Sequence, residues 1–407
     1  MIAWVVSAVL LLGAAILAVP VAVFFCECVL GAGWKERRAT ATRPAGSRAV
    51  ILIPAHNEEE GIRITLERLQ PELSPDDTVL VIADNCTDQT ANVARALGAE
   101  VAERSHDTDR GKGFALAFGA ERIAALPTPP DVVIVLDSDC RFTPGSVDAL
   151  VADCLTRGFP MQGDDELVCP KEAGTKAKIS TFAFRVKNTL RSRGLDRLGM
   201  PRQLAGTGMA FPWPTFRDAP NTRGWITEDL VLGLELTLRR SPVYLCSRAR
   251  VESDVAPSTQ GHTKQRQRWE HGHLSALKQY VPKLLWGAFR QRRISPLAIA
   301  LDLSVPPLAL LTAMVLGLAG VAGLTAMLGL GALPALVMAS QVLALFVAVG
   351  LAWAKLGRDL LTLGDLLRIP LYMLGKLSSY FRWFGGKGDK KWVRAERPDE
   401  EKNEEKK

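Results

Sequence analysis

The long apolar runs of this chain constrain its fold most, because they lie at the two ends of the 407 residues. Residues 2–31 are nearly all apolar and are interrupted only by Pro20 and Glu27. Such a run is long enough to span a bilayer, which needs about 20 residues. A secretory signal peptide would start with positive charge and have a shorter apolar core. We therefore predict an uncleaved transmembrane helix over residues 1–33.

Two further apolar runs, 296–322 and 331–354, are joined through Gly-rich sequence. Each is long enough to span, so residues 296–354 are predicted to form a two-helix transmembrane hairpin. Asp302 lies in the first run, and an acid inside a membrane is costly and often functional. Asp302 is also close to the end of the run, so a solvated position at the interface remains an equal alternative.

Basic residues follow the first apolar run, and they both precede and follow the hairpin. Such residues mark the cytoplasmic side of a membrane protein. They are Lys35, Arg37, Arg38, Arg290, Arg292, Arg293, Lys355 and Arg358. We expect a multi-pass protein of the cytoplasmic (inner) membrane, with the N-terminus outside and the central domain and C-terminus in the cytoplasm.

The region after the hairpin has a different pattern. On a helical wheel over residues 359–385, the polar residues cluster on one side; they are Asp365, Arg368, Lys376, Ser379 and Arg382. This predicts an amphipathic helix lying in the interface, with a third spanning helix as the alternative. Residues 387–407 are dense in both charges and are predicted to be disordered.

The formal net charge of +7 is explained by basic residues beside apolar runs, and no nucleic-acid-binding motif is present in the sequence. The seven cysteines show no CxxC pair or framework spacing. We therefore expect contact with membrane lipids, no nucleic-acid partner, and a reducing compartment.

The middle of the chain alternates short apolar runs with helical stretches. The runs 49–53, 79–83 and 132–136 are rich in Val, Ile and Leu, and helical patterns cover residues 59–70 and 88–98. Continuous apolar strands between helices predict an α/β fold with a mainly parallel, buried sheet and helices on both faces.

Each predicted strand ends in polar residues. His56-Asn57-Glu58 follows the first strand, and Asp84 and Asp137 follow the other two. Ligands of open α/β sheets bind beyond the carboxyl ends of the strands. These polar groups are therefore predicted to converge on one crevice.

Asp137-Ser138-Asp139 closes the third predicted strand. Alternate strand residues share a face, so the two carboxylates are expected on the same side. Hard ions such as Mg²⁺ or Mn²⁺ prefer oxygen ligands, and an ion held there can neutralise a diphosphate leaving group. Taken alone the motif is a weak signal, since two solvated acids in a loop would look the same.

Further motifs follow in order. Lys112 lies in a Gly-rich turn suited to phosphate, and Thr227-Glu228-Asp229 comes later. Asp229 alone could be a helix N-terminal acid favoured by the dipole. In the 265–269 segment, the forked guanidinium of Arg268 can bind phosphate, and the flat indole of Trp269 can stack on a sugar ring.

Together these motifs resemble the family 2 glycosyltransferases, which have the GT-A fold. The resemblance covers about residues 48–275 and extends to the cellulose synthase-like or exopolysaccharide-type pattern of flanking membrane helices. It implies a cytoplasmic GT-A catalytic domain over residues 45–285.

The resemblance also implies a role for each motif residue. Asp137 and Asp139 would hold the metal, Mg²⁺ or Mn²⁺, and Asp229 would be the general base. The nucleotide would contact Ala55, His56, Glu58, Asp84, Lys112 and Ser138. The QxxRW motif and nearby residues would contact the diphosphate and acceptor; they are Gln265, Arg268, Trp269, Glu228, Gly206 and Thr207.

Two of these assignments leave alternatives open. Gly206 could permit close approach of the acceptor or could mark a bulge in a strand. His262, in the loop before the QxxRW motif, could reach substrate when that loop closes.

The resulting functional expectation is an inverting, metal-dependent hexosyltransferase. Its donor would be a nucleotide-sugar, usually UDP-linked in this family, with GDP as the alternative. The few spans favour transfer to a membrane-bound, lipid-linked saccharide, such as a polyprenyl-diphosphate acceptor in exopolysaccharide assembly, possibly in complex with other assembly proteins. The alternatives are a processive polysaccharide synthase with a partner subunit, a sphingolipid-type glycolipid glycosyltransferase, or a non-enzymatic protein with a degenerate domain.

Overall fold

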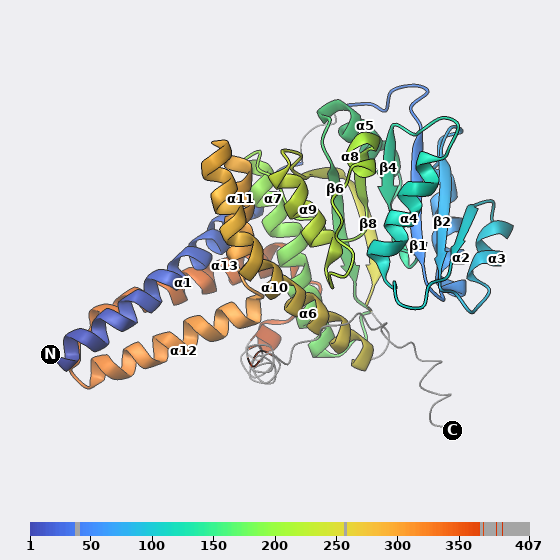
Figure 1. The fold of residues 1–407 in the computed structure, drawn as a ribbon. Helices are drawn as coiled ribbons and strands as arrows, with labels where there is room; N and C mark the ends of the chain where they lie inside the picture. The colour runs from blue at the N-terminus through green and yellow to red at the C-terminus, as the bar shows by residue number, and fades with distance from the viewer. Residues whose placement is uncertain (37–40, 256–258, 367–368, 370–379, 381–384, 386–407) are drawn as a thin grey trace.

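The structure is a computed structural model that describes residues 1–36, 41–255, 259–366, 369, 380 and 385, with the backbone alone at 259–264. Within these residues a sheet with its covering helices forms one end of the molecule. A group of long apolar helices extends away from it (Figure 1).

The sheet has eight strands in the order β3-β2-β1-β4-β7-β6-β8-β5. The first four positions in this order are parallel, β7 runs antiparallel to both its neighbours, β6 and β8 are parallel, and β5 is antiparallel to β8. The prediction of a mainly parallel α/β sheet is confirmed. The strands are β1 (Ala49–Ala55), β2 (Thr78–Asp84), β3 (Glu100–Arg104), β4 (Val132–Val135), β5 (Cys140–Phe142), β6 (Met161–Val168), β7 (Met209–Pro212) and β8 (Tyr244–Asp254).

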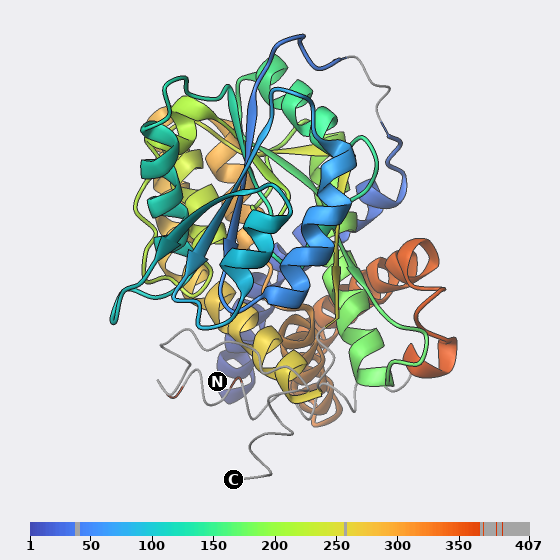
Figure 2. The same cartoon turned by 90° about the vertical axis from the view of Figure 1, so that its right-hand side faces the viewer.

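Helices cover both faces of the sheet, which explains why its central strands are apolar at every position. In β1, Val50 and Leu52 pack under one set of helices, whereas Ile51 and Ile53 pack under the other. The two sets are visible on opposite sides of the strands in Figure 2. One set is α4 (Lys112–Ala124), α8 (Trp213–Arg217) and α9 (Glu228–Leu238), and the other is α2 (Glu59–Leu69), α3 (Thr90–Ala96) and α5 (Ser146–Arg157).

A continuous helical stretch joins the sheet to the apolar helices. It comprises α6 (Thr175–Arg185), the π-helical segment η2 (Val186–Arg191) and α7 (Ser192–Arg197). π-helical turns are rare and are frequently found at functional sites. A short 3₁₀ turn, η1 (Gln70–Glu72), and the long helix α10 (Thr259–Gln291) complete this part of the chain.

Within the described part of the chain, three helices are long and apolar enough to cross a membrane: α1 (Ile2–Ala32), α12 (Leu308–Met327) and α13 (Leu333–Leu356). They lie side by side, and the N-terminus is at the end farthest from the sheet (Figure 1). Gln341 of α13 donates a hydrogen bond of 2.8 Å to the carbonyl of Ala14 in α1. Such a bond satisfies a buried amide inside an otherwise apolar bundle.

The apolar run 296–322 is not one helix, contrary to the sequence-based expectation. It is divided into α11 (Ile294–Ser304) and α12, and the break contains Pro306 and Pro307. Consecutive prolines lack the N–H groups that a helix needs, and each disfavours helical geometry in the residue before it. Asp302 therefore lies in the short helix α11, where it is buried and paired rather than solvated.

The predicted interfacial helix over residues 359–385 lies largely outside the described residues. The charged tail over residues 387–407 lies entirely outside them.

Candidate active site

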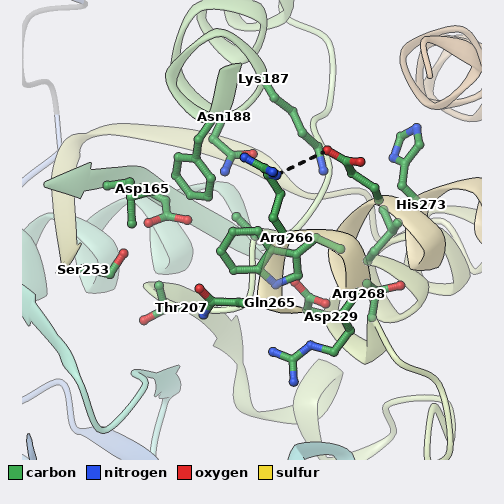
Figure 3. A pocket seen from close by; sticks show the side chains of 18 of the residues that line it. Asp165, Lys187, Asn188, Thr207, Asp229, Ser253, Gln265, Arg266, Arg268 and His273 are labelled. Carbon is green, nitrogen blue, oxygen red and sulfur yellow. Dashed lines mark ion pairs between the residues drawn. The ribbon is translucent and has the colours of Figure 1, made fainter. Parts of the chain in front are cut away.

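One cavity of about 1640 Å³ lies at the carboxyl ends of β1, β2 and β4, under the N-terminus of α9 and beside α10. Every site residue predicted from the sequence lines this cavity. The predicted convergence of the strand ends is therefore observed. Figure 3 shows part of the lining, including Thr207, Asp229, Gln265 and Arg268.

Asp84 marks the end of the cavity near β2. Its side chain is buried and accepts hydrogen bonds from Arg104 Nη1 at 2.6 Å and from Asn85 Nδ2 at 3.0 Å. The backbone carbonyl of the same residue accepts a hydrogen bond from His56 Nδ1 at 2.7 Å, which ties β1 to β2. These hydrogen bonds fix the orientation of the Asp84 carboxylate at the carboxyl end of β2.

The turn after β1 has a backbone shape that suits its sequence. Asn57 has a φ of 54°, and Asn is one of the few residues that adopts this region readily. Its side-chain oxygen accepts a hydrogen bond of 2.7 Å from the backbone N–H of Thr87. The next residue, Glu58, precedes α2, and its backbone N–H donates to Thr90 Oγ1 at 2.7 Å. The two strand-end turns thus support each other.

Lys112 opens α4 after Gly111, whose φ of 118° only glycine adopts without strain. Its ammonium forms an ion pair with Asp137 and donates a hydrogen bond of 2.6 Å to the carbonyl of Gly206. Burial lowers the pKa of Lys112, but the charges of Asp137 and Glu228 outweigh it and raise that pKa overall. Lys112 is therefore a permanent cation at the centre of the site.

Asp137 and Asp139 lie in the turn between β4 and β5, not on a strand as the alternation argument assumed. The strand ends at Val135, since the chain must turn there to bring β5 to β8 at the far edge of the sheet. The two carboxylates are nevertheless close, because one oxygen of each and the thiol of Cys140 lie within 4.8 Å of one another.

This cluster fits a hard divalent ion. Asp139 is exposed and Asp137 half-buried, so both can reach an ion that also touches a ligand in the cavity. Carboxylate oxygens suit Mg²⁺ or Mn²⁺, whereas a thiol suits softer metals. Thr207 Oγ1 accepts a hydrogen bond of 3.1 Å from the backbone N–H of Asp137, which fixes the turn.

Gly206 lies in the loop before β7, next to the acidic residues of α9. Its φ is 97°, and a Cβ at this position would be 3.2 Å from Asp229 Oδ2. Any side chain here would be strained and would press on that carboxylate. Gly206 lies outside β7 (Met209–Pro212), so the alternative of a bulge in a strand does not match its position.

Glu228 and Asp229 form the first turn of α9, as the dipole argument anticipated. Both also line the cavity, so the two interpretations of Asp229 are compatible. Burial raises the pKa of Asp229, although the charge of Lys112 opposes the rise. Burial, and next the charge of Asp229, raise the pKa of Glu228. A carboxylate with a raised pKa at a cavity wall is suited to accept a proton near neutral pH.

The α10 residues Gln265, Arg268 and Trp269 close the other side of the cavity. The indole of Trp269 packs against the ring of Phe184, with 5.7 Å between the ring centroids, so the two rings form one aromatic wall of the cavity. Burial lowers the pKa of Arg268, and the nearby charges of Glu228 and Asp229 oppose this.

Sequence reasoning missed several residues that line the cavity: Asp165, Phe184, Lys187, Asn188 and His273. The stretch that carries Phe184, Lys187 and Asn188 follows β6, a strand that the sequence analysis did not predict, and it contains no motif. No signal in the sequence therefore places it at the site. The side chain of His262, whose approach to substrate was an open expectation, lies outside the described part of the chain.

The far half of the cavity is apolar and is lined by the helices that are long enough to cross a membrane. Its walls include Phe24 of α1, Phe182 of α6, Leu308 and Leu316 of α12, and Phe346 and Val349 of α13. The cavity is therefore continuous from the carboxylates at the strand ends to an apolar space between the long helices.

Comparison with protein families gives two matches along the chain. Residues 50–156 match "Glycosyl transferase family 2", and residues 132–356, more than half of the chain, match "Glycosyl transferase family group 2". The second match includes the turn with Asp137 and Asp139, the α9 acids and the helices α11 to α13.

Two curated relatives resemble part of the chain. Glycosyltransferase AglD of Haloferax volcanii is 35% identical over 114 residues, which are 26% of this chain and 17% of that protein. Succinoglycan biosynthesis protein ExoA of Rhizobium meliloti is 31% identical over 142 residues, 34% of this chain and 42% of that protein. The chain thus spans less than half the length of either relative.

A solved structure shares the architecture over almost the whole chain. It is the mannosyltransferase PcManGT from Pyrobaculum calidifontis in complex with GDP-Man and Mn²⁺, with a TM-score of 0.52 and 15% identity. The match covers 92% of this chain and 99% of that one. At this identity the likeness shows the fold, which is the GT-A fold with flanking apolar helices.

Proposed function

Because this chain belongs to glycosyl transferase family group 2, we propose that it transfers a single sugar from a nucleotide-sugar to a lipid-linked acceptor held in the membrane. The acceptor is a saccharide or headgroup of the kind used in polysaccharide or glycolipid synthesis.

The continuous cavity carries this proposal. Its volume of about 1640 Å³ exceeds the roughly 300–1,000 Å³ of a typical small-molecule site. One end has the carboxylates and cations that a nucleotide diphosphate requires, and the other end is lined by apolar side chains of α12 and α13. A donor at the polar end and a lipid at the apolar end would meet at Asp229.

At the donor end, Asp84 would accept hydrogen bonds from the base, and Ala55, His56 and Glu58 would line the nucleoside. Lys112 pairs with Asp137 through a flexible ammonium. This ammonium would move from Asp137 to the diphosphate when the donor binds. The QxxRW-type residue Arg268 would bind the same diphosphate from α10. UDP is the expected nucleotide and GDP the alternative, the latter being what the solved mannosyltransferase holds.

Asp137 and Asp139 would hold Mg²⁺ or Mn²⁺, and Ser138 between them would lie at the nucleotide. When bound, the ion would neutralise the diphosphate so that it leaves more easily. The two exposed or half-buried carboxylates in one turn support this assignment.

Asp229 would take the proton from the acceptor hydroxyl as that oxygen attacks the anomeric carbon. Attack on the side opposite the leaving diphosphate would invert the anomeric configuration. Glu228, Gly206, Thr207, Gln265 and Trp269 would shape the acceptor side, and the small size of Gly206 supports this because it leaves room beside the carboxylate.

The membrane arrangement follows from the same geometry. The sheet lies at one end of the α1, α12 and α13 group, opposite the N-terminus (Figure 1). Among the described residues, Lys35 follows α1 and Lys355 lies in the last turn of α13. By the positive-inside rule the catalytic domain would be cytoplasmic and the N-terminus outside. Among the residues that the structure describes, only α1, α12 and α13 are long and apolar enough to span, and such a small set favours limited transfer over processive synthesis.

A screen of nucleotide-sugars with detergent-solubilised full-length protein tests the donor half of the proposal. We expect Mn²⁺- or Mg²⁺-dependent binding of at least one UDP- or GDP-sugar, and loss of the metal-dependent part in Asp139→Ala. Asp148→Ala is a matched control, because Asp148 is an exposed acid on α5 outside the cavity. Binding of no nucleotide-sugar with either metal would contradict the proposal.

A further inference from the structure

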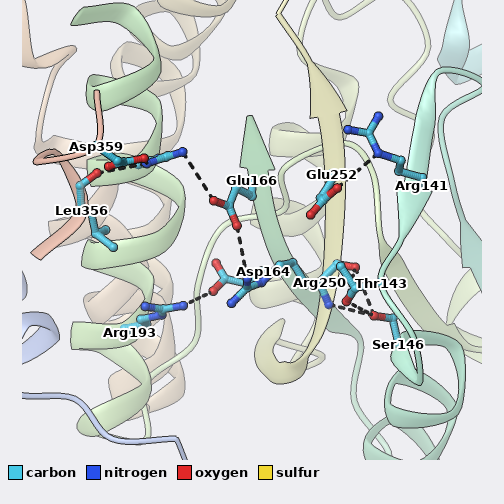
Figure 4. Close-up of polar contacts among 11 residues, drawn as sticks. Arg141, Thr143, Ser146, Asp164, Glu166, Arg193, Arg250, Glu252, Leu356 and Asp359 are labelled. Carbon is cyan, nitrogen blue, oxygen red and sulfur yellow. Dashed lines mark hydrogen bonds and ion pairs between the residues drawn. The ribbon is translucent and has the colours of Figure 1, made fainter. Parts of the chain in front are cut away.

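The helical stretch α6–η2–α7 carries four cations between residues 185 and 193, and three of them are paired. Arg185 contacts Asp359 at 2.7 Å and Glu166 at 3.5 Å. Arg193 contacts Asp164 at 2.6 Å, and this pair and the Glu166 contacts appear in Figure 4. These arginines are satisfied within the protein.

Arg191 is also satisfied, and it anchors the π-helical segment. It contacts Glu27 of α1 at 2.6 Å and Asp302 of α11 at 2.5 Å. Val186 and Leu190 of the same segment pack among the apolar side chains of the membrane-type helices. The segment is therefore held from both its polar and its apolar faces.

Lys187 differs from these three arginines. Its side chain lines the cavity and is exposed there, and within the described part of the chain its ammonium has no hydrogen bond or ion pair. Figure 3 shows it among Asn188, Asp229 and His273 at the cavity wall. A flexible cation left unpaired beside a fixed set of paired ones is available to a ligand.

Lys187 also lies at the junction of the two halves of the cavity. Its segment packs on the apolar helices, and the nearby ring of His273 donates a hydrogen bond of 3.0 Å from Nε2 to Val305, next to the break before α12. Burial, and then the charge of Lys187, lower the pKa of His273 to about 3, so this neighbour is neutral and does not pair with the lysine. At the opposite end, Lys112 and Arg268 already serve the diphosphate of the proposed donor.

We propose that Lys187 binds the phosphate of the acceptor, and hence that the acceptor is a lipid with a phosphate or diphosphate headgroup rather than a neutral glycolipid. This inference rests on the proposed function and narrows its substrate class. The apolar tail would occupy the space between α6, α12 and α13, and its phosphate would reach the ammonium at the junction. Although the side chain is open to the cavity, desolvation by the surrounding protein lowers the pKa of Lys187, and the charge of Asp229 opposes this. An anion bound at the ammonium would add to that opposing charge.

The test measures binding of citronellyl phosphate to the full-length protein in detergent, with citronellol as the probe that has the same tail without phosphate. Inorganic phosphate, which has no tail, is a third probe. Lys187→Met keeps most of the length of the side chain and removes its charge, and Lys187→Arg keeps the charge. Lys178→Met removes a lysine of α6 outside the cavity lining.

We expect Lys187→Met to weaken citronellyl phosphate binding about tenfold or more, the effect of one charge-assisted hydrogen bond. Lys187→Arg and Lys178→Met should bind nearly as the wild type does, and citronellol should bind all variants equally. Inorganic phosphate should bind at least tenfold more weakly than citronellyl phosphate. Equal citronellyl phosphate affinity in wild type and Lys187→Met, or equal affinity of wild type for the phosphate and the alcohol, would overturn the inference.

Nucleotide-sugar binding with Mn²⁺ is measured on the same samples. If it persists in Lys187→Met while citronellyl phosphate binding is lost, Lys187 acts on the acceptor and not on the donor. If it is lost together with lipid binding, the lysine serves the donor and the inference is wrong. Absence of nucleotide-sugar binding in every protein, wild type included, instead marks failure of the proposed function.

Discussion

Arg191 of the π-helical segment η2 donates a hydrogen bond of 2.6 Å to Glu27 of the long apolar helix α1. The same guanidinium donates to Asp302 of α11, which in turn accepts a hydrogen bond of 2.6 Å from Gln203. These buried groups join the sheet domain to the helices that are long enough to span a membrane.

Removing Arg191 should therefore destabilise the whole protein. Arg191→Met leaves two buried carboxylates without their cation, and breaking a buried pair costs about 3–5 kcal/mol. We expect a clear fall in the thermal midpoint of the detergent-solubilised protein, measured by differential scanning fluorimetry. Arg217→Met is the control, because the Arg217–Asp218 pair is exposed and water screens its charges, so its loss should change the midpoint little. Equal midpoints for the two variants would show that the buried network does not hold the parts together.

Asp229→Asn should abolish sugar transfer and leave nucleotide-sugar binding intact. The amide keeps the shape of the side chain but cannot take the proton, and a general base contributes about 10²–10⁴-fold to the rate. The measurements are the transfer rate and the donor dissociation constant. Glu235→Gln is the control, since Glu235 is on the same helix α9 and pairs with Tyr280 outside the cavity lining. Loss of donor binding in Asp229→Asn would argue against the base role.

The pH dependence of transfer should reflect the raised pKa of Asp229. The base acts when ionised, so kcat/KM should fall as the pH falls through this pKa, and the fall should occur above the ordinary range of an aspartate. The charge of Lys187 lowers the pKa of Asp229, so Lys187→Met should move the acid limb of the kcat/KM profile to higher pH. Lys178→Met should leave it in place. A limb that stays fixed, or moves to lower pH, in Lys187→Met would contradict the assignment.

Gly206→Ala should reduce transfer at least about tenfold with little loss of folded protein. Alanine at a φ of 97° is strained by roughly 1–2 kcal/mol, and its Cβ would lie 3.2 Å from Asp229 Oδ2. The transfer rate and the thermal midpoint are measured together. Gly174→Ala is a suitable control, because a Cβ at Gly174 meets no atom within 4 Å. An active Gly206→Ala protein would show that the acceptor side tolerates a side chain there.

Much of this architecture could be predicted from local sequence. The strands β1, β2 and β4 are short runs of Val, Ile and Leu that end in polar groups, and parallel pairing brings those ends together. The pairs Asp137 with Asp139 and Arg268 with Trp269 each lie within five residues, so a motif records them.

Other features depend on contacts that are distant in the sequence. Lys187 is one of several basic residues in its stretch, and only the tertiary pairing of Arg185, Arg191 and Arg193 distinguishes it. Pro306 and Pro307 indicate that the run 296–322 is divided into two helices, but the hydropathy of the run does not show this division. The turn position of Asp137 was missed for a similar reason, because the length of a strand is set by its partners.

The mass of the lipid product tests the central claim most directly. Membranes containing the wild-type protein are incubated with the donor found in the screen and Mn²⁺, and the lipid extract is analysed by mass spectrometry against Asp229→Asn membranes. We predict a phosphate-containing lipid whose mass increases by one sugar and which is absent with Asp229→Asn. A long polymer, a modified lipid without phosphate, or an identical product in both membranes would contradict this prediction.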